Sequence, residues 1–181
     1  MRMTGRFGGL RSSGSAGPRI EEANIIMRTL LYAALSIVLL VPDAHAALPY
    51  DEATDPHTAL AQALTQAKQQ NKNVLLIFGA NWCEDCRDLD KAMRGSSAML
   101  IDARFVVVKI DVGNFNKNLD LAQQFGNPIR KGIPAAVLLT PESQLLYSTK
   151  AGELANARRM GERGIYDFFS KTMADVLKTR Q

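Results

Sequence analysis

The sequence contains few of the residues that commonly build metal centres or structural crosslinks: two cysteines, two histidines and one tryptophan among 181 residues. A structural zinc ion usually takes four Cys or His ligands. Beyond Cys83 and Cys86, only His57 remains once the N-terminal segment described below is removed. A structural zinc site is therefore excluded, and no metal-ligating residues are assigned.

Other functional signatures are missing as well. No basic run is interleaved with aromatic residues, which argues against nucleic acid as a partner. No nucleotide or flavin motif occurs, so we expect no cofactor, and no internal repeat is visible. With 46% hydrophobic and 22% charged residues, the composition is that of a soluble globular protein rather than a disordered chain or a membrane bundle.

The long apolar run near the N-terminus has the pattern of a secretory signal. In residues 27–46, MRTLLYAALSIVLLVPDAHA, the basic Arg28 precedes an apolar stretch over 30–41, and Ala-His-Ala at 44–46 is a small-x-small cleavage site. The stretch is shorter than the ~20 residues that a membrane-spanning helix needs. We therefore predict a cleaved signal peptide. Residues 1–26 are rich in Gly, Ser and Arg without periodicity, and we interpret them as a non-native or disordered extension.

The remaining residues, 47–181, fit one domain. Continuous apolar runs predict buried strands, and apolar residues at helical spacing predict helices. An early βαβ crossover followed by a β-hairpin predicts an α/β fold with a central mixed sheet flanked by helices on both faces. In order, the expected elements are a helix from 55 to 71, a strand at 73–78, a helix from 83 to 94, a strand at 104–112, a helix at 118–125, strands at 135–140 and 145–149, and a last helix through 165–176.

Both cysteines lie in GANWCEDCRDLD, residues 79–90, where a buried strand leads into a helix. Unpaired N–H groups and the positive end of the helix dipole stabilise an anion at a helix N-terminus. Only a thiolate attacks a disulfide, and a free thiol titrates at about 8.5. Cys83 is therefore the predicted nucleophile, and Cys86, one turn later and less exposed, is the predicted resolving cysteine.

A cysteine pair at this spacing has two other uses, a structural disulfide and a metal site. A structural disulfide across so short a loop removes little entropy from the unfolded chain, so it would stabilise the fold poorly. Copper binding would need a further soft ligand, and Met93 alone lies within a few residues of the pair. Redox exchange is the favoured interpretation, with copper binding as the minor alternative.

The motif WCEDC after a buried strand, together with Gly-Ile-Pro at 132–134 before a later strand, resembles the thioredoxin-fold family. The resemblance spans about residues 55–178. It implies a cis peptide between Ile133 and Pro134 beside the cysteines, with the Ile133 backbone binding an extended substrate segment. Trp82, directly before the reactive thiol, is expected to shield the disulfide and to offer partners a flat apolar surface.

The sequence also departs from the family pattern. Thioredoxin carries a buried aspartate where this chain has Ile77, so another proton acceptor is needed. Asp90, one helical turn after Cys86, is the candidate acceptor, and the alternative is an exposed helix acid. NPIRK at 127–131 lengthens the approach to the proline loop, where we expect it to alter partner choice.

Charged residues between and beyond the cysteines bear on the direction of electron flow. Glu84 and Asp85 should oppose a nearby thiolate and raise the pKa of Cys83, which makes the dithiol a stronger reductant, unless both side chains are screened by water. Arg158, Arg159 and Arg163 are interpreted as a solvated helical face without a role.

These observations favour a periplasmic thiol:disulfide oxidoreductase that reduces the disulfides of protein partners. Its electrons would come from another protein dithiol, in the membrane or the periplasm, and we expect a monomer. The alternatives are a disulfide oxidase or isomerase, or a non-enzymatic module that binds copper.

Overall fold

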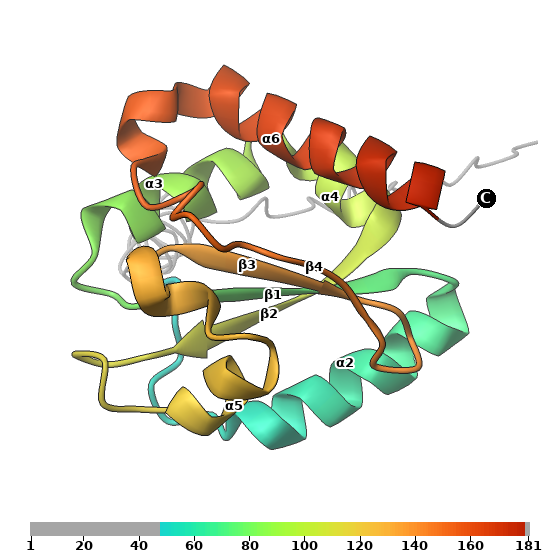
Figure 1. The fold of residues 1–181 in the computed structure, drawn as a ribbon, viewed down its shortest axis with the longest axis horizontal. Helices are drawn as coiled ribbons and strands as arrows, with labels where there is room; N and C mark the ends of the chain where they lie inside the picture. Colours follow the sequence, from blue (N-terminus) through green and yellow to red (C-terminus); the bar gives the residue numbers. More distant parts are fainter. Residues whose placement is uncertain (1–47, 180–181) are drawn as a thin grey trace, which may run out of the picture. The chain divides into compact units, whose positions relative to one another are not determined.

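Strand β1 (Asn73–Gly79) lies inside a four-stranded sheet of order β2-β1-β3-β4 in the computed structural model, which describes residues 48–179 (Figure 1). It pairs in parallel with β2 (Phe105–Asp111) and antiparallel with β3 (Ala135–Leu139), which pairs antiparallel with β4 (Leu145–Ser148). The predicted mixed sheet is confirmed. The signal peptide expected at 27–46 and the extension at 1–26 lie outside the described residues.

Helices cover both faces of this sheet, as predicted. Helix α2 (Pro56–Gln70) and helix α5 (Leu119–Gln124) lie on one side, while α3 (Glu84–Arg94), α4 (Ala98–Arg104) and α6 (Ala157–Thr179) lie on the other (Figure 1). The expected N-cap of α2 is present, because the Asp55 carboxylate accepts a hydrogen bond of 2.8 Å from the Thr58 N–H. Among residues 48–179, no helix is long and apolar enough to cross a membrane.

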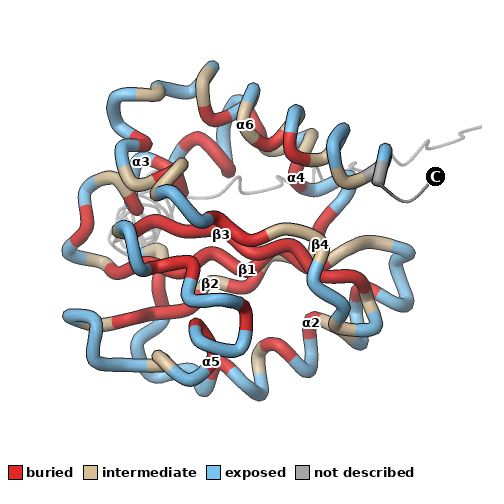
Figure 2. The backbone as a smooth tube through the Cα atoms, in the orientation of Figure 1, coloured by how far each residue is buried: buried red, intermediate tan, exposed pale blue. Residues whose placement is uncertain are grey.

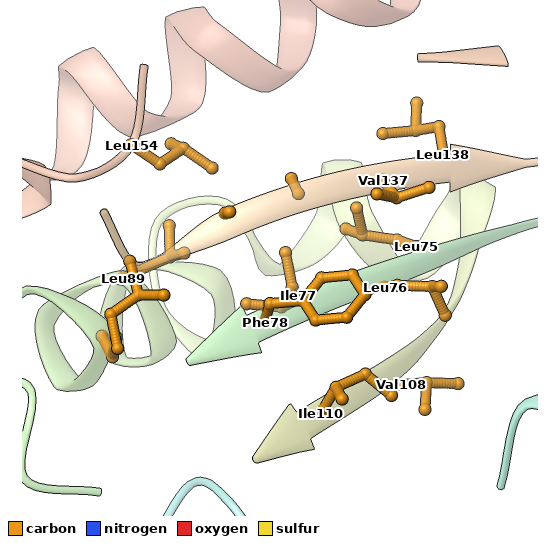
Figure 3. Packing of buried hydrophobic residues seen from close by; sticks show 14 of the residues in the cluster. Leu75, Leu76, Ile77, Phe78, Leu89, Val108, Ile110, Val137, Leu138 and Leu154 are labelled. Carbon is orange, nitrogen blue, oxygen red and sulfur yellow. The ribbon is translucent and has the colours of Figure 1, made fainter. Parts of the chain in front are cut away.

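The core is built around β1 and β3, whose residues are buried along almost their whole length (Figure 2). Side chains alternate across a strand, so Leu75 and Ile77 point to one face of β1 while Leu76 and Phe78 point to the other. Figure 3 shows them among apolar side chains of β2, β3 and α3. A strand buried on both faces is apolar along its length, which is why the apolar run at 73–78 was enough to predict β1.

Two elements were not predicted. Helix α4 forms in a stretch to which the sequence analysis assigned no element, and it ends at Arg104, so the second strand begins at Phe105 rather than at 104. Its signal is weak because Ile101 is its one fully buried residue and its N-cap, Ser97, makes no side-chain capping bond. The 3₁₀ turn η1 (Pro128–Lys131) forms within NPIRK, the stretch interpreted as a longer loop.

Candidate active site

The site lies where β1 ends. The chain leaves the sheet at Gly79 and turns through three residues, and Cys83 then becomes the N-cap of α3. The Cys83 sulfur accepts a hydrogen bond of 3.2 Å from the Cys86 N–H, one of the amides that a helix N-terminus leaves unpaired. The expectation that the cysteines open a helix is confirmed.

The two thiols have opposite electrostatic environments. Hydrogen bonding from the Cys86 side chain lowers the pKa of Cys83 to about 7, against the opposing effects of burial and of the Asp85 charge. The pKa of Cys86 is raised, first by its hydrogen bond to Cys83 and then by burial. Cys86 is wholly buried, whereas Cys83 retains 6% exposure. This arrangement favours Cys83 as the thiolate and Cys86 as the group that holds the proton.

The loop before β3 lies against the first cysteine. The peptide bond between Ile133 and Pro134 is cis, as expected, and the Ile133 carbonyl oxygen lies 3.7 Å from Cys83 Sγ. Strands β1 and β3 are antiparallel neighbours, so the C-terminal end of β1 lies beside the N-terminal start of β3. The fold thus brings Cys83, Cys86, Ile133 and Pro134 together.

Trp82 forms the exposed border of the site. Its side chain is 54% exposed, its indole N–H donates a 2.9 Å hydrogen bond to the Gly113 carbonyl, and its ring packs edge to face with Phe115 at 6.3 Å. Trp82 is therefore not a core residue. Phe115, itself 43% exposed, was missed by the sequence analysis, although a lone aromatic residue in a loop rich in Asn and Lys was a usable signal.

A groove continues from this aromatic pair. It is a cavity of about 390 Å³ whose lining includes Phe115, Leu119, Ile129 and Arg130, and it reaches Gly132 beside the cis-proline loop. Ile129 and Arg130 belong to η1, so the stretch expected to alter partner choice does border the site.

Asp90 is not the exposed helix acid that one alternative expected, since its side chain is 3% exposed. Its Oδ2 accepts hydrogen bonds of 2.9 and 2.6 Å from Arg94, and its Oδ1 pairs with Lys109 of β2. The buried carboxylate therefore ties α3 to the edge of the sheet. Its role as a proton acceptor for Cys86 stays a prediction.

Arg158 is solvent-exposed, as the sequence interpretation expected, but it is not without contacts. Its main-chain N–H, in the first turn of α6, donates a 2.9 Å hydrogen bond to Asp85 Oδ1. Its guanidinium pairs with Glu84 and lies 3.9 Å from Asp85. The contact joins α3 to α6 and places a positive charge against both carboxylates that stand between the cysteines. Arg163 pairs with Asp167 at 4.0 Å on its own helix.

Tyr50 was also missed. Near the start of the described chain, its ring is buried to 3% exposure, and two hydrogen bonds join its backbone to the side chain of Asn81, two residues before Cys83. Nothing in the local sequence marks this contact, because the partners are 31 residues apart.

Possible metal ligands do not gather within the part of the chain that the structure describes. In residues 48–179, no three His, Cys, Asp or Glu side chains lie together as a metal site. His57 instead pairs with Asp120 of α5, at 2.8 Å. Met93 is buried in the core.

Comparison with known proteins agrees with this architecture. A family model described as thioredoxin-like matches residues 55–141. The crystal structure of a disulphide isomerase from Xylella fastidiosa is 53% identical, covers 71% of this chain and 98% of its own, and has a TM-score of 0.68. A thioredoxin from Thermus thermophilus is 20% identical, with 65% and 83% coverage and a TM-score of 0.46. No curated protein matches.

The chain belongs to the thioredoxin-like family of thiol:disulfide oxidoreductases.

The ion pairs of Arg158 lead to a first prediction. Arg158→Ala removes a positive charge from Glu84 and Asp85 while leaving the main-chain bond to Asp85 intact, so the pKa of Cys83 should rise by a few tenths, a small change because the groups are partly exposed. Iodoacetamide alkylation rates across pH 5–9 measure it. Arg159→Ala, the adjacent exposed arginine, is the control and should leave the pKa unchanged. A fall in the pKa after Arg158→Ala would contradict the assignment.

A second prediction separates the two roles of Asp90. Asp90→Asn leaves Lys109 without its anionic partner and should lower the free energy of unfolding by about 1–3 kcal/mol, the cost of leaving a partly buried polar group unsatisfied. Urea unfolding measures this, with Asp88→Asn, an exposed acid of the same helix, as the control. If stability is unchanged while disulfide exchange slows, Asp90 acts as the proton acceptor instead.

Proposed function

We propose that this protein is a periplasmic thiol:disulfide oxidoreductase that reduces disulfides of protein partners through Cys83 and Cys86. The observation that carries the proposal is the asymmetric pair at the start of α3, in which one thiol has a pKa of about 7 and the other is buried with a raised pKa. At neutral pH about half of such a first thiol is ionised, while the second keeps its proton until it is used.

The exchange proceeds in two steps. The Cys83 thiolate attacks one sulfur of the partner disulfide, which forms a mixed disulfide and releases the other partner sulfur as a thiolate that takes a proton from solvent. Cys86 then attacks Cys83 Sγ, the mixed disulfide breaks, and the proton of Cys86 balances the second departing thiolate. Two electrons pass to the partner, and Cys83 and Cys86 are left as a disulfide.

The reductive direction is supported by the acidity of Cys83. A thiolate that is strongly stabilised makes the oxidised form a strong oxidant, as in sites with a cysteine pKa of about 3.5, whereas reducing thioredoxins have values of about 7. The Cys83 pKa of about 7 belongs with the reducing group. Glu84 and Asp85 contribute less to this than the sequence suggested, because Arg158 pairs with both.

A reductant in the periplasm must be reduced again by a dedicated donor, because that compartment is kept oxidising. We propose a membrane or periplasmic dithiol protein as the donor, since the sequence has no nucleotide or flavin motif. The signal peptide predicted at 27–46 supports the location.

A second candidate function is disulfide isomerisation. It is favoured by the 53% identity to the disulphide isomerase from Xylella fastidiosa. An isomerase uses the same nucleophile but works at a less reducing potential, about −180 mV against about −270 mV for thioredoxin.

Partners are proposed to bind across Trp82, Ile133 and Pro134. The occupant would be an extended segment of a disulfide-bonded protein, paired with the Ile133 backbone and packed on the exposed rings of Trp82 and Phe115. The groove beyond Phe115 would receive a side chain of that segment, and the exposed Arg130 at its border favours an acidic one.

The direction is tested by equilibrating the protein with glutathione buffers. The expected potential lies closer to about −270 mV than to about −180 mV, and the protein should catalyse insulin reduction by dithiothreitol. Cys83→Ser should abolish that activity, while Arg159→Ala should retain it. A potential near −180 mV with efficient reactivation of scrambled ribonuclease would favour the isomerase, and one near −120 mV an oxidase.

The proposed periplasmic location and the proposed partner surface are tested together by trapping mixed disulfides between this protein and its partners. Cys86→Ala cannot resolve mixed disulfides, so the full-length variant expressed in a Gram-negative host should accumulate them with periplasmic proteins, visible on non-reducing gels. Adding Phe115→Ser should reduce capture severalfold by removing apolar contact area, whereas Tyr166→Ser, an exposed aromatic on α6, should not. Capture of cytoplasmic proteins alone would contradict the proposed location.

A further inference from the structure

The segment before α2 contributes a side chain to the cysteine pair. The Tyr50 N–H donates a 3.0 Å hydrogen bond to Asn81 Oδ1, and Asn81 Nδ2 donates one of 2.8 Å back to the Tyr50 carbonyl. Asn81 Nδ2 also contacts Glu52 Oε1 at 2.9 Å. The turn that leads from β1 to Cys83 is thereby fixed to residues 50–52, and the Tyr50 ring is held inside the protein.

The Tyr50 hydroxyl lies over Gly79, beside the second cysteine. A Cβ added to Gly79 would come within 3.0 Å of both the hydroxyl oxygen and Cys86 Sγ, so these two atoms occupy the space above the glycine together. Hydrogen bonding between the Tyr50 hydroxyl and Cys86 lowers the pKa of Cys86, against the larger effects that raise it. The absence of a side chain at Gly79 is what allows this approach.

The groups around the hydroxyl make it a donor. Burial raises the pKa of Tyr50 well above its ordinary value, and negative charge on Cys86, Cys83 and Asp111 raises it further. Asp111, at the end of β2, is buried. Its Oδ1 accepts a hydrogen bond of 3.2 Å from the Gly113 N–H, and its Oδ2 lies 3.3 Å from Lys117 Nζ. Tyr50 therefore stays protonated, and a protonated phenol beside a forming thiolate donates its hydrogen.

We propose that Tyr50 is a further catalytic residue for the resolving step, in which its hydroxyl donates a hydrogen bond to Cys86 Sγ and stabilises the thiolate that attacks the mixed disulfide. This inference rests on the proposed function. It assigns a neutral donor to a site where the buried Ile77 supplies no acid. The step remains balanced, because the S–S bond from Cys86 to Cys83 forms, the bond from Cys83 to the partner breaks, and the Cys86 proton ends on the departing partner sulfur.

The test separates the two steps in one trace. Reduced protein is mixed with 5,5′-dithiobis(2-nitrobenzoate) in a stopped-flow instrument, and each step releases one coloured thiolate: the first when Cys83 attacks, the second when Cys86 resolves. Tyr50→Phe should slow the second release roughly three- to tenfold at pH 7, the size expected for one hydrogen bond to a charged group when part of its effect is offset by nucleophilicity. The first release should change less than twofold.

The pH profile distinguishes this role from a structural one. In Tyr50→Phe, the pH at which the second release reaches half its limiting rate should move upward, because Cys86 ionises less readily. Tyr166→Phe, which removes an exposed hydroxyl on α6, is the matched control and should change neither phase. An unshifted profile with a lower limiting rate, or an unchanged second release, would overturn the proposal.

A second variant keeps the proposal testable if Tyr50→Phe folds poorly. Site-specific replacement of Tyr50 by 3-fluorotyrosine retains the ring and makes the hydroxyl a stronger donor, so the profile of the second release should move to lower pH. A shift to higher pH, or none, would count against the hydrogen bond. Absence of the first release in the unmodified protein would instead refute the proposed function.

Discussion

The site depends on the hydrogen bonds that converge on the Cys83 sulfur. An N–H of the first turn of α3 donates a hydrogen bond to this sulfur, and hydrogen bonding from the Cys86 side chain lowers its pKa. The start of the helix therefore supplies the groups that stabilise negative charge on Cys83. Because those groups exist only while β1 ends at Gly79 and α3 begins at Glu84, the chemistry of the thiol is a property of the backbone path. The buried core under β1 maintains that path.

The negative charge of Glu84 and Asp85, between the two cysteines, is balanced by the positive charge of Arg158. Asp85 opposes ionisation of Cys83, but Arg158 holds Asp85 and Glu84 on the side facing α6. Asp85 also accepts a hydrogen bond from the Arg158 main-chain N–H in the first turn of α6. The same carboxylate therefore satisfies an N–H at the start of a neighbouring helix and acts on the charge of Cys83. A change in the packing of α6 would therefore alter the acidity of the cysteine without touching it.

The sequence was informative where the determining pattern is local. The apolar run at 73–78 predicted β1, Asp55 and Pro56 predicted the start of α2, and the spacing of the two cysteines at a strand end predicted their place on α3. Contacts that join distant segments were not accessible in this way. Arg158 and Asp85 are 73 residues apart, and Tyr50 and Asn81 are 31 apart. Burial of Asp90 likewise depends on Lys109, which only the pairing of β2 with β1 places nearby.

The antiparallel pairing of β1 with β3 has a consequence for recognition. Cys83 follows one strand and the cis-proline loop precedes its direct neighbour, so their separation is set by sheet register rather than by a hinge between moving parts. A site of this kind incurs little ordering entropy of its own when a partner docks. For the partner segment proposed above, the loss of freedom would fall on the incoming chain, which would have to expose a flexible stretch around its disulfide. Selectivity would then depend on how easily each partner adopts an extended conformation there.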